Sequence, residues 1–487
     1  MIALTATALF ALLRDPVLAG APAGRMAWPV LLASSCATLL VMSLLHGDLQ
    51  NMYRKLVEAE ERAQDAARRD ELTGLGNRKF LFEKLEHYVG LPEQSGSTVL
   101  LLVDLDHFKR VNDTLGHAAG DQLIKVVAER LKSIAHDAEI VRLGGDEFAL
   151  IVETRDRDAL VTLCDRIVAS LSLVIRLAQG DCFISGSVGA AYLEDGLGVS
   201  ELMRRADLAM YKAKSEVRGA RIYDQEMSDE AYRRASLATA LCKSLETGEG
   251  LATHYQRIVT PAGELHAIEA LLRWKHSEFG EVPVREIISV AEERHLINEV
   301  GLFVAREVCQ AAKAFPEAIV CFNVAAIQLL DLNFSTDLID ILAKNGVSPA
   351  QIQIEMRERE FVERAREIGP TFEHLAGAGF HLAVDDFGSS ISSLSQLQKL
   401  GVTVVKLDHN VLEDAREMAS IAVIQAKVGL ARSLGMIVIC EGVNDEIDEA
   451  TAIQSGCDFL QGYRYGRPTL LASLSAEEQT PVLRALP

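Results

Sequence analysis

The sequence lacks the features of a secreted, disulfide-bonded protein and of a nucleic-acid-binding protein. Its 8 cysteines are scattered among 487 residues, and no C-x-x-C pair occurs. This spacing excludes a disulfide scaffold or a zinc ribbon and fits a reducing compartment. Basic residues are also scarce, since 49 Lys and Arg against 69 Asp and Glu give a formal charge of −20. We therefore expect no nucleic acid among the partners, although backbone amides or metal ions can still bind phosphates locally.

The composition is that of a folded, multidomain chain. Hydrophobic residues make up 49% and charged residues 24%, and about 150 residues per domain suggests about three units. We predict a membrane anchor at residues 1–46, a linker helix at 47–69, and two catalytic domains at 70–228 and 236–480.

An uncharged apolar run at residues 26–45 predicts a membrane-spanning helix, because 20 such residues cross ~30 Å of hydrocarbon. A signal peptide or a buried core helix is the alternative, but the run is long for a signal peptide and starts far from Met1. The basic residues that follow it are Arg54, Lys55, Arg62, Arg68 and Arg69. Their excess places the rest of the chain in the cytoplasm, so we expect an inner (cytoplasmic) membrane protein with cytoplasmic catalytic domains.

The stretch from Gly47 to Asp70 is polar and favours a helix. Its apolar residues recur at steps of three or four, with one break at Glu60. Two interpretations remain open: a helix that pairs weakly with a second copy, and a solvated linker.

In the first domain, acidic residues follow segments that read as strands. Residues 97–103 form a buried strand that ends in Asp104-Leu105-Asp106, and residues 121–135 have a helical period. Two apolar runs, 139–143 and 148–152, flank Gly144-Gly145-Asp146-Glu147, which predicts a tight hairpin. Mg²⁺ prefers one or two carboxylates together with substrate phosphates, and the glycines allow a polyphosphate to approach the backbone.

These motifs resemble the GGDEF family of diguanylate cyclases. The resemblance rests on residues 70–78 (DELTGLGNR), 104–109 (DLDHFK), 112–117, 142–148 (RLGGDEF) and 206–214. It implies an α/β fold like the catalytic domain of adenylyl cyclases. It also implies that two such domains in a homodimer, each holding one GTP, join the nucleotides into cyclic di-GMP.

Site residues of the first domain follow from that resemblance. Asp104, Asp146 and the carbonyl of Leu105 would hold Mg²⁺ (or Mn²⁺), and Glu147 would act as an acid/base or metal-site partner. The residues implied to bind substrate are Phe108, Lys109, Asn112, Asp121, Gly144, Gly145, Lys214 and Arg218. Taken alone, Asp121 could be only a helix N-cap, and the Gly-Gly turn could be a plain hairpin, although Asp104 in register argues against the plain hairpin. The family's product-inhibition motif is absent, because Ala135 and Ala138 occupy its positions, and Val217 replaces a frequent glycine.

The second domain alternates short apolar runs with helical stretches such as 284–297 and 415–434, which predicts a (β/α)₈ barrel. The eight runs are 254–259, 265–274, 318–324, 351–356, 380–387, 402–408, 436–441 and 457–462. Most contain a polar residue that can bind metal. Acidic residues converging on one rim, together with one lysine, indicate a two-metal site that cleaves a phosphodiester.

This domain resembles the EAL family of cyclic di-GMP phosphodiesterases. The resemblance rests on residues 269–274 (EALLRW), 385–388 (DDFG), 406–408 (KLD), 441–443 (EGV) and 461–468 (QGYRYGRP). It implies hydrolysis of cyclic di-GMP to linear pGpG with two Mg²⁺ or Mn²⁺ ions. The implied metal ligands are Glu269, Asn323, Glu355, Asp385, Asp386 and Glu441. The implied catalytic and binding residues are Lys406, Glu441 and Gln461, with Gln256 and Arg273 on the dinucleotide and Glu358 as loop support.

Several residues depart from the EAL pattern. They are Arg257 for Pro, Ala325 for Ser, Arg357 for Thr, Ser390-Ile391 for Gly-Tyr, and Asn444 for Glu. Changes beside metal ligands commonly cost ~10–100-fold in affinity or activity. The sequence therefore leaves two readings open: an active phosphodiesterase, or an active cyclase whose weak or inactive EAL domain binds cyclic di-GMP.

Overall fold

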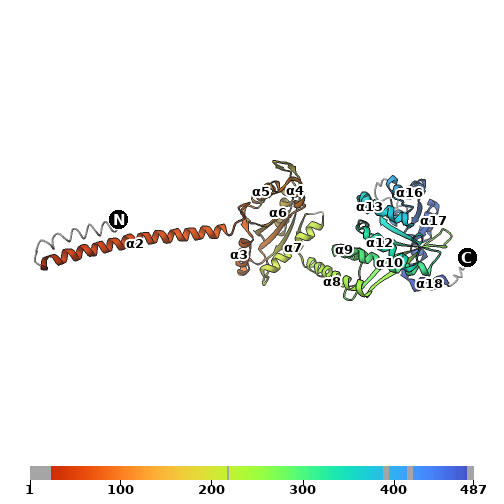
Figure 1. The fold of residues 1–487 in the computed structure, drawn as a ribbon, viewed down its shortest axis with the longest axis horizontal. Helices are drawn as coiled ribbons and strands as arrows, with labels where there is room; N and C mark the ends of the chain where they lie inside the picture. Colours follow the sequence, from red (N-terminus) through yellow and green to blue (C-terminus); the bar gives the residue numbers. More distant parts are fainter. Residues whose placement is uncertain (1–22, 217–218, 388–393, 414–420, 480–487) are drawn as a thin grey trace. The chain divides into compact units, whose positions relative to one another are not determined.

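The chain divides into two units, Met1–Ala231 and Tyr232–Pro487, each with its own sheet (Figure 1). The computed structural model describes residues 23–216, 219–387, 394–413 and 421–479. Three predicted features, Val217, Arg218 and the loop 389–393, lie outside these ranges, as does part of the predicted helix 415–434.

A helix of 44 residues, α2 (Ala23–Ala66), precedes the first sheet. It contains most of the predicted linker helix and ends four residues before Asp70. Over the part of the chain that the structure describes, no helix has both the length and the hydropathy needed to cross a membrane. The predicted span at 26–45 falls partly outside the residues whose side chains are described.

The first unit is a mixed α/β domain around a six-stranded sheet in the order β1-β3-β4-β2-β7-β8. The strands are β1 (Gly76–Asn77), β2 (Thr98–Leu105), β3 (Glu139–Gly144), β4 (Glu147–Glu153), β7 (Gly186–Tyr192) and β8 (Ala220–Ile222), with a separate hairpin of β5 (Ile175–Leu177) and β6 (Gly180–Cys182). The helices are α3 (Arg78–Val89), α4 (Phe108–Leu115), α5 (His117–Ile134), α6 (Arg157–Leu171) and α7 (Val199–Ser215), and η1 (Pro92–Gln94) is a short 3₁₀ turn. Helix α8 (Gln225–Thr247) begins in this unit, but most of its residues belong to the second unit, where Leu237 and Leu241 are part of the core. Every residue of β2 is buried, which explains its continuous apolar sequence.

The strand, the hairpin and the helix predicted for this unit are all present, and only the start of the helix differs. The strand predicted at 97–103 is β2, and the Gly-Gly segment joins β3 to β4 as an antiparallel hairpin. Helix α5, however, begins at His117 rather than Asp121. Its N-cap is Gly116, which provides no side-chain cap, so the usual polar start signal is missing.

The second unit is a closed eight-stranded barrel, and each of the eight predicted runs overlaps one of its strands. The order is β10-β12-β13-β14-β15-β16-β17-β9, closed by pairing of β9 with β10. The strands are β9 (Leu251–Val259), β10 (Leu265–His276), β12 (Ile319–Asn323), β13 (Ile352–Arg357), β14 (His381–Asp385), β15 (Val404–Leu407), β16 (Ile437–Cys440) and β17 (Phe459–Gln461), with β11 (Gly280–Glu281) and β18 (Thr469–Leu470) at the margins.

The barrel departs from an all-parallel (β/α)₈ arrangement in its first strand. Strand β9 runs antiparallel to both of its neighbours, β10 and β17, whereas the other barrel pairs are parallel. Only residues 260–264 join β9 to β10, and a link this short makes a hairpin rather than a helical crossover. Alternation of strands and helices therefore begins only after β10.

Helices form the outer layer around the barrel in Figure 1. They are α9 (Val284–Glu293), α10 (Ile297–Ala314), α11 (Ala326–Leu329), α12 (Leu332–Asn345), α13 (Glu358–Ala378), α14 (Leu394–Lys399), α16 (Ile421–Ser433), α17 (Glu446–Ser455) and α18 (Leu471–Gln479), with 3₁₀ turns η2 (Pro349–Gln351) and η3 (Tyr463–Tyr465). The predicted helix 284–297 is two helices, because the chain turns at His295, whose φ is 57°.

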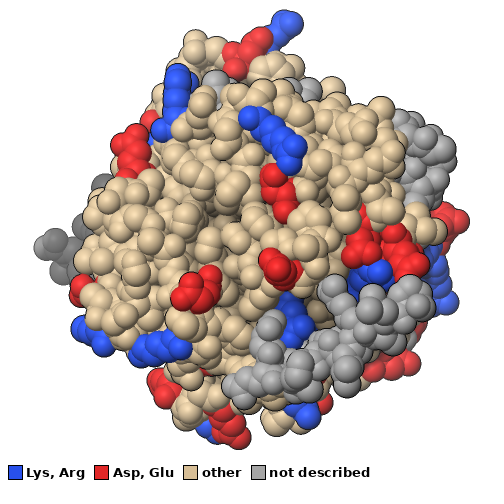
Figure 2. All heavy atoms as spheres, turned by 90° about the vertical axis from the view of Figure 1, so that its right-hand side faces the viewer, with Lys and Arg blue, Asp and Glu red and all other residues tan. Residues whose placement is uncertain are grey.

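Charged side chains of both signs are scattered over the face shown in Figure 2, singly or in small groups. Among the described residues drawn on that face, lysine and arginine do not gather into an extended basic surface. An extended basic surface is typical of a nucleic-acid-binding protein, and the described residues on this face do not form one.

Candidate active sites

In the first unit, the predicted carboxylates come together where β2 meets the β3–β4 turn. Asp104 is 9% exposed near the end of β2, and its partners in register are Glu147 on β4 and Ser187 on β7. Asp146 lies in the turn directly before Glu147. The side chain of Leu105 is buried and has no atom that binds a metal, so only its carbonyl could be a ligand.

This acidic group has more negative charge than its cation neutralises. Burial raises the pKa of Asp146 and of Glu147, and the charge of Asp104 raises both further. Lys214 Nζ lies 2.5 Å from Asp104 Oδ2, and this contact raises the pKa of the lysine. Carboxylate oxygens in excess over nearby cations fit Mg²⁺ or Mn²⁺ chemically.

Arg142 stabilises the turn that contains Asp146. Its Nη2 donates to the carbonyl of Gly145 at 2.8 Å, and its Nη1 lies 3.1 Å from Asp70 Oδ2. Asp70 also accepts from the backbone N–H and the hydroxyl of Thr73 at 2.8 and 2.6 Å. The segment that follows α2 is thereby tied to the acidic turn. In the sequence, Asp70 and Arg142 belong to the motifs that resemble the GGDEF family, but no structural or catalytic role was predicted for either residue.

Asn112 and Asp121 lie on two helices that meet at a glycine. A Cβ on Gly120 would lie 2.0 Å from Asn112 Oδ1 and 3.2 Å from Phe108 Cζ, so only glycine allows α4 and α5 to approach this closely. Asp121 is the fifth residue of α5 and is exposed, which excludes the N-cap interpretation.

The other predicted substrate residues of this unit lie around the same corner. Phe108 is half-buried at the start of α4, and Lys109 beside it is exposed. Gly144 and Gly145 both have positive φ, 144° and 53°, a conformation that disfavours other residues. Asp207, which the prediction omitted, lines a cavity of about 310 Å³ together with Glu147 and Arg78.

In the barrel, the predicted site residues share one face because side chains alternate along a strand. A lower layer of small apolar residues fills the interior: Ile258, Ala267, Cys321, Ala383, Val404 and Ile439. On each of these parallel strands, or in the segment directly after it, a polar residue follows the lower-layer residue by two positions. These polar residues are Glu269, Asn323, Asp385, Lys406 and Glu441. On the antiparallel strand β9, Gln256 comes two positions earlier instead. The period of two therefore places all six polar residues in the layer above, at the carboxyl end of the barrel.

Lys406 lies at the centre of this polar layer and is completely buried. Its Nζ is 3.0 Å from Glu269 Oε2, 2.9 Å from Glu355 Oε2 and 2.5 Å from Glu441 Oε1. Strands β10, β13 and β15 and the segment after β16 thus contribute to one ionic cluster.

Amide side chains orient the carboxylates of the cluster. Asn323 Nδ2 donates to Glu269 Oε1 at 2.8 Å, and Gln461 Nε2 donates to Glu269 Oε2 at 2.6 Å. Gln353 Nε2 donates to Glu355 Oε1 at 2.8 Å. Gln461 also contacts Gln256 Oε1 at 3.3 Å, which joins the two strands that close the barrel.

The charges of the cluster do not balance. Burial raises the pKa of Glu355 to about 7 and of Glu441 to about 8, although Lys406 opposes both shifts. Burial also disfavours ionised Glu269, but Lys406 and the amide hydrogen bonds outweigh it and lower that pKa. Three carboxylates share one ammonium, and Oε1 of Gln461 is buried without a hydrogen bond.

An oxygen-rich group that lacks positive charge fits a divalent cation such as Mg²⁺ or Mn²⁺. Over the described residues, no three His, Cys, Asp or Glu side chains are already arranged to hold a metal ion. The ammonium of Lys406 lies where three of the carboxylates converge, so metal binding requires these side chains to rearrange around it.

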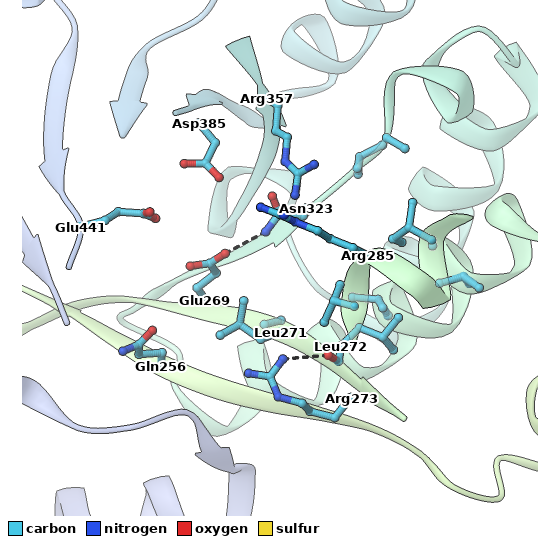
Figure 3. A pocket seen from close by; sticks show the side chains of 18 of the residues that line it. Gln256, Glu269, Leu271, Leu272, Arg273, Arg285, Asn323, Arg357, Asp385 and Glu441 are labelled. Atoms are coloured by element: carbon cyan, nitrogen blue, oxygen red, sulfur yellow. Dashed lines mark hydrogen bonds between the residues drawn. The ribbon is translucent and has the colours of Figure 1, made fainter. Parts of the chain in front are cut away.

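A cavity of about 810 Å³ opens over the cluster (Figure 3). Gln256, Glu269, Asn323, Asp385 and Glu441 all line it. Arg273 also lines the cavity, and its Nη1 donates to the carbonyl of Leu272 at 2.8 Å.

Two of the residues that depart from the EAL pattern, Arg357 and Asn444, line this cavity. Asp386 adopts φ of 57°, and the Nε of Arg357 lies 3.9 Å from its Oδ2. Asn444 lines the cavity, and its backbone N–H donates to Asp448 Oδ2 at 3.0 Å. Glu358, at the start of α13, is fully buried.

Both units match models of known protein families. A family model described as "EAL domain" matches residues 236–468, and one described as "Diguanylate cyclase, GGDEF domain" matches residues 67–220. The chain is 31% identical to a bifunctional diguanylate cyclase/cyclic di-GMP phosphodiesterase, MucR of Pseudomonas aeruginosa, over 90% of this chain and 67% of the relative. It is 34% identical to the cyclic di-GMP phosphodiesterase PdeR of Escherichia coli, over 84% of this chain and 63% of the relative.

A solved structure supports the fold. The S helix–GGDEF–EAL part of Vibrio cholerae LapD, bound to c-di-GMP, matches with a TM-score of 0.52 and 18% identity, and covers 85% of this chain and 100% of that one. The chain spans between about half and two thirds of the length of the first curated relatives that it matches.

Proposed function

The chain belongs to the family of tandem GGDEF–EAL proteins, and from this premise we propose that it turns over cyclic di-GMP. In this proposal the barrel hydrolyses cyclic di-GMP to linear pGpG. The first unit condenses two GTP to cyclic di-GMP, or binds GTP as a regulator. The ionic cluster around Lys406 is the observation that carries the proposal, because it gathers three carboxylates from three parts of the barrel around one buried lysine beneath a cavity.

The proposed barrel reaction is attack of water on one phosphodiester. The oxygen of water bonds to phosphorus, the bond to the ribose 3′-oxygen breaks, and the leaving oxygen takes a proton. Divalent ions held by Glu269, Asn323, Glu355, Asp385, Asp386 and Glu441 would supply a hydroxide at neutral pH and neutralise phosphate charge. Lys406 holds three of these carboxylates in place, and Gln461 orients Glu269. Gln256 and Arg273 lie on the cavity wall where they can bind the dinucleotide.

The test is incubation of the purified full chain with cyclic di-GMP and Mg²⁺ or Mn²⁺, with and without GTP, followed by chromatographic separation of pGpG. We expect pGpG, and we expect Glu269→Ala to abolish it. Stimulation by GTP would make the first unit a regulator as well. Absence of pGpG under every condition would overturn the phosphodiesterase assignment.

The proposed cyclase reaction is attack of a ribose 3′-hydroxyl on an α-phosphorus, with release of pyrophosphate. Asp104 and Asp146 would hold the metal, Lys109 and Lys214 would neutralise phosphate charge, and Asn112 and Asp121 would hydrogen-bond to guanine. One unit offers one such site, so we propose a homodimer as the active form. Formation of cyclic di-GMP from GTP by the wild type, and not by Asp146→Ala, tests this proposal.

A second candidate function is a cyclase whose barrel only binds cyclic di-GMP. The contact of Arg357 with Asp386 favours it, because a guanidinium beside a predicted ligand competes with a cation for that carboxylate. Cyclic di-GMP binding in Mg²⁺ and Mn²⁺ without turnover would support this candidate.

We propose that residues 26–45 anchor the chain in the inner membrane with both catalytic units in the cytoplasm. The uncharged run and the basic residues after it support this placement. Recovery of the full chain in the detergent-extracted membrane fraction, with loss of that behaviour on deleting 26–45, tests it.

A further inference from the structure

Two arginines that the family pattern did not single out as ligands lie at the rim of the barrel cavity. Arg285 is on α9 and Arg357 is the last residue of β13, and both line the cavity. Figure 3 shows their side chains pointing toward each other beside Asn323, across the cavity from Arg273. Two guanidinium groups thus converge next to the predicted metal ligands.

Within the described parts of the chain, one carboxylate, that of Asp386, forms an ion pair with either arginine. Arg357 lies 3.9 Å from Asp386, beyond hydrogen-bonding distance, and its side chain is 54% exposed. Among the described residues, no carboxylate forms an ion pair with Arg285. Glu360, which lines the same cavity, accepts a hydrogen bond from the backbone N–H of Ala326 at 3.0 Å. Two cations that face each other without a close counter-ion attract an anion.

The position of Arg285 and Arg357 in the cavity indicates which kind of anion they would bind. Hydrolysis turns a phosphodiester with one negative charge into a terminal phosphate that carries nearly two at neutral pH. In the proposed reaction that phosphate forms at the metal ions that Asn323 and Asp385 would hold, and Figure 3 shows the guanidinium groups of Arg285 and Arg357 next to Asn323. Guanidinium groups bind phosphate oxygens in a bidentate manner. Cyclic di-GMP has no terminal phosphate, whereas its linear product has one.

We propose that Arg285 and Arg357 form a subsite for the terminal 5′-phosphate of a linear guanine dinucleotide. This inference rests on the proposed phosphodiesterase function and extends it to the linear product. The subsite makes pGpG a retained ligand of the barrel, so that pGpG competes with cyclic di-GMP for the cavity.

Binding of pGpG and of GpG, which lacks the terminal phosphate, measures the subsite directly. The full chain is titrated by calorimetry in Ca²⁺ with pGpG, GpG and cyclic di-GMP. We expect the wild type to bind pGpG about tenfold more tightly than GpG, since charge-assisted contacts to one phosphate contribute roughly that factor. In Arg285→Gln/Arg357→Gln this preference falls to about twofold or less, while affinity for cyclic di-GMP stays within about threefold.

The matched control is Arg294→Gln/Arg359→Gln. These arginines are exposed near the end of α9 and in the first turn of α13 and do not line the cavity. The control keeps the wild-type preference. An unchanged preference in Arg285→Gln/Arg357→Gln would overturn the subsite while leaving the phosphodiesterase proposal intact. Failure of the wild type to bind cyclic di-GMP would instead overturn the proposed function of the barrel and the subsite with it. The single variant Arg357→Thr gives a smaller loss of the same preference.

Discussion

The two candidate sites use similar chemistry in opposite settings. In the first unit, acids gather at a strand end and a hairpin turn near the surface, and the lysine paired with Asp104 is 51% exposed. In the barrel, carboxylates from strands far apart in the sequence surround a lysine with no exposed surface. The first site depends on the shape of one turn, whereas the second depends on the charge balance of the whole interior. We therefore expect substitutions in the two sites to have different effects on stability and activity.

The largest expected difference between the sites comes from removing the lysine of each. Lys406→Met leaves the buried Glu269 and Glu355 and the partly exposed Glu441 without their cation, so we expect a loss of about 3–5 kcal/mol in unfolding free energy and no measurable pGpG formation. Lys214→Met removes a solvent-screened pair and costs less than about 1 kcal/mol, although cyclic di-GMP synthesis falls. Urea unfolding and product chromatography measure both effects. Lys399→Met, at an exposed position on α14, is the control, and equal destabilisation by Lys406→Met and Lys214→Met would contradict the comparison.

A second variant tests whether the first site depends on its turn. Arg142→Met releases the carbonyl of Gly145 and the carboxylate of Asp70, so we expect cyclase activity to fall about 10–100-fold. The barrel has no part in this contact, and pGpG formation should stay unchanged. Arg157→Met, exposed at the start of α6, serves as the control in the same two assays. A cyclase that keeps wild-type activity would show that the turn holds its shape without Arg142.

A glycine substitution tests the close approach of α4 and α5. Gly120→Ala places a methyl group against Asn112, which we expect to raise the KM for GTP and to cost about 1–3 kcal/mol in stability. Gly198→Ala is the matched control, because no atom lies within 4 Å of its added Cβ and its φ is negative. Similar KM values in the two variants would exclude a role for this contact in positioning Asn112.

The smallest expected effect is an opposite pH dependence of the two units. In the first unit, hydrogen bonds from Thr73 and the charge of Arg142 outweigh burial and lower the pKa of Asp70, so its contribution is lost as pH falls below about 4. In the barrel, burial raises the pKa of Glu355 to about 7 and of Glu441 to about 8. The folded barrel then binds more protons than the unfolded chain, so without metal its stability decreases as pH rises through 6–9.

Thermal unfolding of the metal-free chain measures the barrel effect. We expect the barrel transition to fall by a few degrees between pH 6 and 9, and Mg²⁺ to reverse the fall at the alkaline end. Glu355→Gln removes one titrating group and should flatten the profile. A barrel that gains stability as pH rises without metal would contradict the charge imbalance.

Local patterns made much of the first unit predictable from its sequence. The strand β2, the hairpin and the acids at both follow from hydrophobic runs and turn residues close together in the chain. The start of α5 was not predictable, since Gly116 offers no capping side chain. The contact between Arg142 and Asp70 spans 72 residues, and no local rule connects them.

The strands of the barrel and their polar residues were also predictable, but their mutual contacts were not. Alternation along each strand indicates which residues face inward, as Ala383 and Asp385 illustrate. It does not indicate how strands are staggered, so the meeting of Lys406 with three carboxylates required the structure. Arg285 comes from a surrounding helix, and strand periodicity gives no signal for it.

The antiparallel strand β9 has a consequence for how the barrel forms during synthesis. Its hairpin with β10 brings Gln256 beside Glu269 through local pairing, which can occur early. The final seam, between β9 and β17, joins residues 205 positions apart, as in the contact of Gln256 with Gln461. At about 5–20 residues per second, a ribosome needs roughly 10–40 s to add that segment. During that interval the edge of β9 that will pair with β17 stays unpaired. The ligand pocket is complete only after β17 has been synthesised and has paired with β9.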